Sequence, residues 1–373
     1  MRENLHRSPI APGAIEATGP RYCPSFEEKI VRFPDKPSHQ IFLEPEGWAT
    51  SEVYVQGFFT GMPEDVQQAM LHSVPALREA DILRPGYAIE YDSVPADQIT
   101  AWLETKQVEG LFHAGQINGT SGYEEAAAQG LMAGVNAALK VQGKPPLILR
   151  RDQAYIGVLI DDLITKEIDE PYRMLTSRAE YRLLLREDNA DLRLSPQGYQ
   201  AGLLSRERHE TAERKRRAVT AELERLKATF LRPTPEVNAQ LTAAGLALVD
   251  DGLNAYKLLQ RPQVSYKLVA TLTPSPSPLP RDVADQVWIE AHYAGYIEKQ
   301  RREVERARRL EDQAIPTDFD YNVVVGLRNE AREKLNRVRP ATVGQASRIY
   351  GVNPADISLL LIYLHRLRAS PQN

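Results

Sequence analysis

The only cysteine of this 373-residue chain, Cys23, lies in a segment that could make its thiol reactive. Arg21 and Lys29 flank it, and a nearby cation favours the thiolate, which is the reactive form of cysteine. Ser25 precedes a Phe-Glu-Glu run and predicts a helix N-cap, whose positive end would add to this effect. A small buried hydrophobic side chain is the alternative role for Cys23. One cysteine excludes an internal disulfide.

A glycine-rich run at residues 110–130 is the second segment with the composition of a ligand site. A short apolar run predicts a strand, Gly115, Gly119 and Gly122 predict a loop, and a helix follows at once. Such a loop lets a flat or anionic ligand approach the backbone and presents unpaired N–H groups to it. The spacing is not the dinucleotide fingerprint GxGxxG. A tight strand–helix turn with glycines for packing is an equally good interpretation.

Arginines recur at helical spacing within residues 170–194. Arg178, Arg182 and Arg186 stand four residues apart, which would put them on one face of a helix. Arginine rows suit phosphate backbones, and the neighbouring Tyr181 suits an unstacked base. Salt bridges to acidic residues of the same segment are the competing interpretation. The seven histidines lack the spacing of metal ligands, so we expect no metal site.

The elements that must position these segments differ along the chain. Short β-prone runs at 40–43, 52–55 and 87–91 predict strands, and residues 63–74 predict a helix. Residues 123–139 are Ala-rich and apolar nearly all round, which predicts a buried helix. This mixture is typical of an α/β region.

The second half of the chain has helical patterning. Apolar residues at helical spacing predict helices at 206–231 and 284–309, and the proline-rich residues 274–280 predict a stiff connector. The end of the chain predicts two short helices around a Gly-Val-Asn-Pro turn. The domains that we expect are 1–96, 97–142, a linker at 143–155, a helical domain at 156–273 and a C-terminal helical subdomain at 274–373.

Charge is distributed unevenly. Residues 1–150 carry a balance of −7, whereas residues 151–373 carry +3, which is compatible with a nucleic-acid partner for the second half. A solvated helical surface of mixed charge explains these numbers equally well. No apolar run is long enough to span a membrane, the N-terminus lacks a secretion signal, and the single cysteine suits a reducing compartment. We therefore expect a cytoplasmic protein.

Six segments of the chain match the sequence of a known family, in that family's order and over essentially the whole chain. They are GPRYCPSFEEKIVRF at 19–33, IFLEPEG at 41–47, RPGYAIEYD at 84–92, AGQINGTSGYEEAAAQG at 114–130, EPYRMLTSRAEYRLLLREDNADLRL at 170–194 and GQASRIYGVNP at 344–354. In these segments the chain resembles the tRNA uridine 5-carboxymethylaminomethyl modification enzymes, the MnmG or GidA family.

The resemblance implies a fold and a reaction. The fold would be part of a two-dinucleotide-binding flavoprotein (α/β) followed by an all-helical C-terminal region. Such a protein acts on the wobble uridine of tRNA: NADH reduces FAD, and a methylene group from methylenetetrahydrofolate is joined to uridine C5 with glycine or ammonia. The helical region would bind tRNA and the GTPase MnmE. A homodimer, and a heterotetramer with MnmE, would be the assemblies.

The resemblance also implies site residues. Cys23 matches one of two functional cysteines, acting either as a nucleophile on uridine C6 or in proton transfer. Gln116 matches a flavin contact. The stretch that matches a dinucleotide-binding segment consists of Gly19, Pro20, Arg21, Tyr22, Cys23, Pro24, Ser25, Phe26, Glu27, Glu28, Lys29, Ile30, Val31, Arg32 and Phe33.

One departure from the family concerns its opening βαβ unit. That unit carries the glycine-rich FAD pyrophosphate loop and the other functional cysteine, and this sequence starts inside the family's sequence, shortly before Cys23. We expect the chain to be a C-terminal portion of such an enzyme. The alternative function is a non-catalytic fragment that binds tRNA or MnmE without flavin chemistry.

Overall fold

The computed structural model describes residues 1–9, 24–89, 92–95, 98–166 and 170–369. The chain forms two compact units, which are described separately. One unit comprises residues 1–96, 113–130 and 168–173, and the other comprises residues 97–112, 131–167 and 174–373. The predicted division into five domains stays a prediction.

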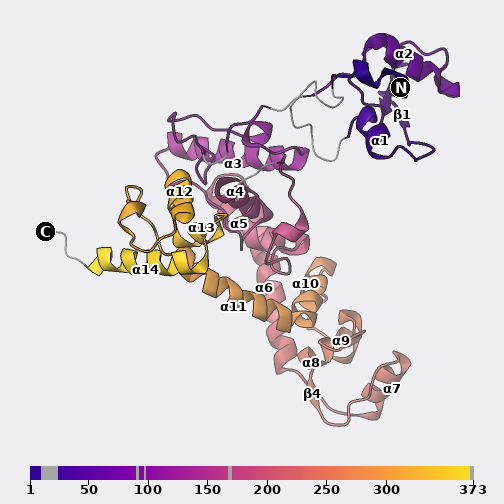
Figure 1. Ribbon diagram of the computed structural model, residues 1–373. Helices are drawn as coiled ribbons and strands as arrows, with labels where there is room; N and C mark the ends of the chain where they lie inside the picture. Colours follow the sequence, from indigo (N-terminus) through magenta and orange to yellow (C-terminus); the bar gives the residue numbers. More distant parts are fainter. Residues whose placement is uncertain (10–23, 90–91, 96–97, 167–169, 370–373) are drawn as a thin grey trace. The chain divides into compact units, whose positions relative to one another are not determined.

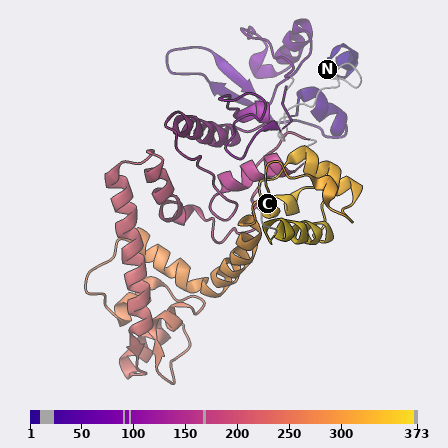
Figure 2. The ribbon, with the colours of Figure 1, turned by 90° about the vertical axis from the view of Figure 1, so that its left-hand side faces the viewer.

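The first unit holds a two-stranded antiparallel hairpin and two short helices. Strand β1 (Phe42–Pro45) pairs with β2 (Val53–Gln56), and α2 (Glu64–His72) follows. These elements confirm the strands and the helix predicted around 40–43, 52–55 and 63–74 (Figures 1 and 2). The strand predicted at 87–91 is wrong for its described residues 87–89, which pair with no strand. Arg84-Pro-Gly precedes that run, and its turn chemistry outweighs the β-prone side chains.

Helix α3 (Tyr123–Val141) confirms the Ala-rich helix predicted at 123–139, but the predicted burial is only half right. One face packs inward, where the amide of Asn136 binds Trp102 and Leu147 and Lys140 pairs with Glu104. The opposite face is open, with Val141 89 % exposed. Alanine and glycine lack the polarity that marks a solvent face, so composition alone overstated the burial.

The second unit is mainly helical (Figures 1 and 2). Two small strands, β3 (Phe230–Leu231) and β4 (Leu253–Asn254), pair antiparallel. Its later helices are α4 (Tyr155–Thr165), α5 (Ala190–Gln200), α6 (Arg206–Ala228), α7 (Pro235–Ala243), α8 (Ala255–Leu259), α9 (Tyr266–Leu272), α10 (Arg281–His292), α11 (Ala294–Glu311), α12 (Asn329–Val338), α13 (Val343–Arg348) and α14 (Pro354–Ala369).

Two separate hydrophobic cores hold the helices from α6 to α10 and from α12 to α14. One core gathers buried residues of α6 to α10, including Leu226, Leu258 and Val287. Because α10 packs on α6, α8 and α9, the proline-rich residues 274–280 join two helices of the same core. The other core gathers residues of α12 to α14 and the segment before them, including Leu335.

The helices predicted in the second half of the chain are confirmed, except that one of them is interrupted. Helix α6 confirms the helix predicted at 206–231, and α13 and α14 confirm the two terminal helices, with Gly351 at φ 90° in the turn between them. The helix predicted at 284–309 is two helices, α10 and α11. The break falls at Tyr293, whose φ −97° and ψ 12° lie outside the helical region.

Candidate functional site

The segment around Cys23 is only partly described. Gly19, Pro20, Arg21, Tyr22 and Cys23 lie outside the described residues. Residues 24–89 are described, and α1 (Phe26–Arg32) begins two residues after Pro24. The Ser25 hydroxyl accepts the backbone N–H of Glu28, and the Glu28 carboxylate accepts the N–H of Ser25. This capping box confirms the predicted N-cap.

Helix α1 is tied to residues 57–61 by three of its own residues. The Phe26 N–H donates to the carbonyl of Phe59 at 2.7 Å, and the Lys29 ammonium donates to the carbonyl of Gly57 at 2.9 Å. The Lys29 ammonium, which the sequence suggested as a cation near the Cys23 thiol, is therefore hydrogen-bonded to a backbone carbonyl.

Glu27 is the third tie and was not singled out from the sequence. It is 2 % exposed, and its Oε1 accepts from the hydroxyls of Thr60 and Ser8 and from the N–H of Gly61, at 2.8–3.1 Å. Hydrogen bonds of this kind offset the free-energy cost of removing a carboxylate from water. Because Glu27 is acidic and stands in an amphipathic helix, the sequence did not indicate that its side chain is buried.

The glycine run forms a loop with the backbone conformation that glycine permits. A 3₁₀ turn, η4 (Gly115–Asn118), is bounded by positive φ at Gly115 (82°) and Gly119 (80°), and α3 begins four residues later. Gln116 is exposed on this turn. The strand predicted before it is reduced to an isolated bridge of Phe112. No hydrogen bond between described residues joins Gln116 to α1.

Three buried polar atoms around this loop have no partner in the part of the chain that is described. They are His113 Nδ1, Asn118 Oδ1 and Ser121 Oγ. Asn118 is 1 % exposed, and its amide nitrogen is already used by Gln129. Because buried polar atoms usually have partners, we treat these three atoms as candidate contacts for a polar ligand. Sequence analysis found the loop through its glycines and missed these three atoms.

The start of α3 has a mixed electrostatic character. Glu124 and Glu125 occupy the first turn, and Arg173 pairs with both. A Cβ at Gly122 would meet the Glu125 carboxylate, so a larger residue there would have to displace the Glu125 side chain. Two carboxylates at a helix N-terminus oppose a phosphate group. The loop therefore suits a flat ligand with an uncharged polar edge.

The predicted arginine row is wrong, because the segment is not a helix. Residues 176–178 form a single 3₁₀ turn, and the chain continues irregularly to residue 186. Arg178 lies 3.8 Å from Asp162. Arg186 forms ion pairs with Asp188 and Glu290, so this arginine makes salt bridges of the kind that the competing interpretation predicted. Arg182 is exposed. Irregular backbone breaks the four-residue repeat on which the row depended.

Several of these charges belong to a buried network around α4. The Arg151 guanidinium, 8 % exposed, binds Asp161, Asp162 and Glu180. Burial lowers the pKa of Arg151, but the carboxylates outweigh it and the pKa is raised. Arg348 of α13 makes two 2.7 Å bonds to Asp161 and also contacts Glu311. This network fastens α13 to α4.

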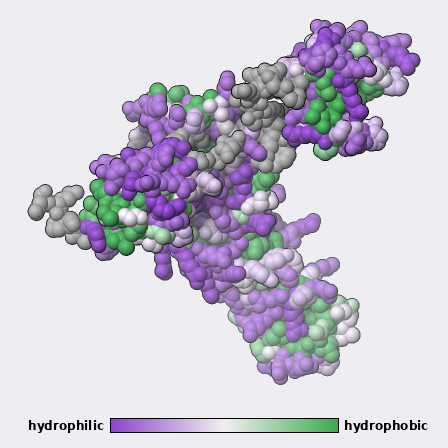
Figure 3. Space-filling view, viewed as in Figure 1, coloured by the Kyte–Doolittle hydropathy of each residue, from purple (hydrophilic) through white to green (hydrophobic). Residues whose placement is uncertain are grey.

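A basic stripe lies instead on α11. Lys299, Arg302, Arg306 and Arg309 are exposed at spacings that share one helical face, with the 67 % exposed Tyr296 beside them. Arg302 pairs with Glu298, and the other three make no ion pair with a described residue. Figure 3 shows mainly hydrophilic surface in this part of the molecule. The sequence showed both the charges and their helical spacing, and the structure adds that these side chains are exposed.

Within the described residues, no cluster of His, Cys, Asp and Glu could hold a metal ion. None of the described helices has the length and apolar character needed to cross a membrane.

Three family profiles match the chain. "Glucose inhibited division protein A" matches residues 1–145, the "tRNA modifying enzyme MnmG/GidA C-terminal helical domain" matches 206–301, and the "C-terminal helical bundle" of the same enzymes matches 303–373. The chain is 58 % identical to the tRNA uridine 5-carboxymethylaminomethyl modification enzyme MnmG of Exiguobacterium sibiricum over 363 residues. It is 55 % identical to that of Bacillus subtilis over 365 residues.

These alignments cover 97–98 % of this chain but 58 % of each relative, so the chain spans little more than half their length. Two crystal structures of Aquifex aeolicus GidA superpose with TM-scores of 0.80 and 0.79 at 46 % and 47 % identity, over 97 % of this chain. They confirm the predicted fold class, a partial α/β region followed by a helical region.

Proposed function

The chain belongs to the MnmG/GidA family, and from this premise we propose that it acts in tRNA modification at the wobble uridine. The reaction is the addition of a carboxymethylaminomethyl group to C5, with NADH-reduced FAD and methylenetetrahydrofolate as the one-carbon donor. The observation that carries this proposal is 58 % identity to an MnmG enzyme along 97 % of the chain. The cytoplasm, where tRNA is modified, is the proposed location.

The glycine loop fits the flavin that this family implies. Flavin supplies hydride transfer when it is bound. Its ring is flat and has an uncharged polar edge, which suits His113 Nδ1, Asn118 Oδ1 and Ser121 Oγ, the three unpartnered atoms. Gln116, exposed on the positive-φ turn, is the proposed side-chain contact. The acidic first turn of α3 keeps phosphate groups away from this end and thus orients the ligand.

Cys23 is the proposed catalytic residue, as a nucleophile on uridine C6 or as an acid–base group, and residues 19–33 are proposed to contact the dinucleotide. Helix α1 supports the role of Cys23, because its capping box and three ties hold the chain that follows Pro24. A strain lacking MnmG activity is complemented with the gene's full reading frame, and tRNA nucleosides are measured by mass spectrometry. Cys23→Ser should abolish the modified nucleoside and keep tRNA affinity within about twofold. Unchanged modification would refute this role.

The stripe on α11 is proposed to contact the tRNA backbone. Replacing Arg302, Arg306 and Arg309 by Ala removes three exposed cations without touching a core. Affinity for tRNA should fall, and the slope of log K against log salt should decrease by about 2. Replacing Arg206 and Arg208 of α6 is the matched control. An unchanged slope would show that the stripe does not contact phosphates.

The C-terminal bundle is the proposed contact for the GTPase MnmE, in a heterotetramer built on a homodimer. Several apolar side chains of the bundle lie outside its core and are exposed: Val325 is 75 % exposed, Tyr350 70 % and Val323 51 %. Val323 and Val325 stand two residues apart, and neighbouring exposed apolar side chains of this kind are typical of a partner contact. Val325→Asp should weaken co-purification with MnmE while leaving thermal stability unchanged.

A non-catalytic fragment that binds tRNA or MnmE is the second candidate. It is favoured by the two helical cores, which are complete within residues 206–369. A visible absorption spectrum and a tRNA gel shift of the purified chain separate the candidates. Flavin absorption supports the enzyme, whereas a colourless chain that still shifts tRNA supports the fragment.

A further inference from the structure

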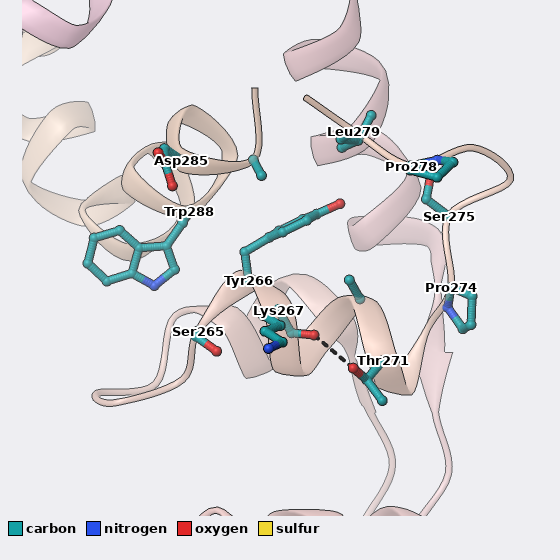
Figure 4. A pocket seen from close by; sticks show the side chains of 12 residues that line it. Ser265, Tyr266, Lys267, Thr271, Pro274, Ser275, Pro278, Leu279, Asp285 and Trp288 are labelled. Carbon is teal, nitrogen blue, oxygen red and sulfur yellow. Dashed lines mark hydrogen bonds between the residues drawn. The ribbon is translucent and has the colours of Figure 1, made fainter. Parts of the chain in front are cut away.

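A pocket of about 730 Å³ opens in the first helical core, outside every segment assigned above. It lies between α9, the proline-rich residues 274–280 and α10. Figure 4 shows the Tyr266 ring extending across it, with Trp288 on one side and Ser275 and Pro278 on the other. Its volume is within the usual range for small-ligand sites.

Two aromatic rings of the pocket are held in place by their polar atoms. The Tyr266 hydroxyl donates to Glu222 of α6 at 2.7 Å, and the Trp288 indole N–H donates to the carbonyl of Val264 at 2.9 Å. His292 stacks on Trp288 with 4.7 Å between ring centroids. The rings therefore offer apolar surface in a set orientation, which reduces the entropy lost when a flat ligand stacks on them.

Polar groups surround these rings. Ser275 brings a hydroxyl, whereas the Ser265 hydroxyl caps α9 by accepting the Leu268 N–H. Asp285, which lies 3.7 Å from Arg281, brings an exposed carboxylate that can accept an amino group. The Thr271 hydroxyl already donates to the Lys267 carbonyl. The Lys267 ammonium is exposed and makes no ion pair with a described residue. A flat ring edge with donors and acceptors, joined to an anionic group, matches this arrangement.

We infer that this pocket takes an unstacked nucleobase of a bound RNA, with Lys267 facing the adjoining phosphate. The inference rests on the proposed function, since it names a subsite for the same RNA. Aromatic faces bind every base, and hydroxyl and carboxylate groups meet base edges. A proline-rich peptide also docks on aromatic surfaces, but it offers no anion to Lys267.

The first test compares pocket variants of the full chain in tRNA binding. Tyr266→Leu removes the ring and Thr271→Trp fills the pocket from its exposed side, and each should weaken tRNA binding about tenfold. Tyr266→Phe keeps the ring and should bind within twofold of the parent. Circular dichroism and melting temperature check that each variant folds. A parent that binds no tRNA contradicts the proposed function, whereas equal affinity of parent, Tyr266→Leu and Thr271→Trp overturns the pocket.

The second test separates base from charge. Lys267→Ala should weaken tRNA binding by threefold or more, whereas Lys257→Ala, an exposed lysine of the same domain outside the pocket, should not. Uridine and adenosine 5′-monophosphates should shift the indole N–H signal of Trp288 in nuclear magnetic resonance, and ribose 5-phosphate should not. A shift with a proline-rich peptide and none with the nucleotides would overturn the inference.

Discussion

Residues 24–89 and residues 206–369 bury their apolar side chains to very different extents. In the helical region, two cores enclose residues such as Leu226 and Leu335 at 0 % exposure. The N-terminal segment has one small cluster around Met62. Its hairpin leaves Phe42 49 % and Tyr54 52 % exposed.

The difference shows what local pairing achieves without a core. A two-stranded hairpin satisfies its inner hydrogen bonds but has no layer to cover its faces, and such a hairpin is at best marginally stable. Each helical core combines several amphipathic helices and removes its own apolar surface from water. Residues 206–369 thus cover most of their own apolar side chains, whereas the hairpin leaves side chains on both of its faces exposed.

Amide hydrogen exchange should show the largest contrast. Amides in the cores, such as Val287 and Leu360, are expected to exchange roughly a thousandfold more slowly than Val55 in the hairpin, because their opening requires disrupting a core. Mass spectrometry of peptides from both regions measures this. Similar protection in both regions would contradict the proposed difference in stability between the hairpin and the helical cores.

Core truncation should destabilise the C-terminal bundle strongly. Leu335→Ala removes a fully buried side chain of α12 and should lower the free energy of unfolding by about 3 kcal/mol. Leu43→Ala, at 45 % exposure in the hairpin, should cost less than about 1 kcal/mol. Chemical denaturation followed by circular dichroism is the measurement. Val325→Ala is the surface control, and equal losses at Leu335 and Leu43 would argue against separate cores.

The charge network should contribute less than a core leucine. Arg348→Met breaks both bonds to Asp161 and leaves that carboxylate with Arg151, which should cost about 2 kcal/mol. Arg302→Met on the exposed stripe is the matched control and should cost less than about 0.5 kcal/mol. Thermal unfolding of both variants decides this. No difference between them would mean that α13 is held by apolar contacts alone.

The smallest expected effect is a pH dependence. The Lys140 ammonium, the Gly110 N–H and the Trp102 indole lower the pKa of Glu104 to about 2. A carboxyl group whose pKa is lower in the folded state stabilises the fold at pH values above its ordinary pKa. This contribution is lost as the pH falls toward the pKa of the folded state. Glu104→Gln should therefore flatten the stability profile between about pH 4.5 and pH 2 and cost about 1 kcal/mol at pH 7. Parallel profiles would contradict this.

Local patterns predicted the elements better than the site. The capping residues around Ser25 and the apolar spacing of residues 206–231 act within a few residues, so α1 and α6 followed from sequence. The arginine row failed because spacing implies a face only if a helix forms. The break at Tyr293 was not predicted, although Gly295, two residues later, has a low helix propensity.

The sequence by itself determined which family this chain joins, where its glycines allow a loop, and which helices carry charge. Tertiary structure alone decided that Glu27 is buried and that Tyr266 and Trp288 line one pocket. It also decided that three polar atoms near Gly119 have no partner among the described residues. The physical reason is the distance along the chain over which each effect acts. Backbone preference and helical periodicity act between near neighbours, whereas burial and partner choice depend on residues that meet only when distant segments pack.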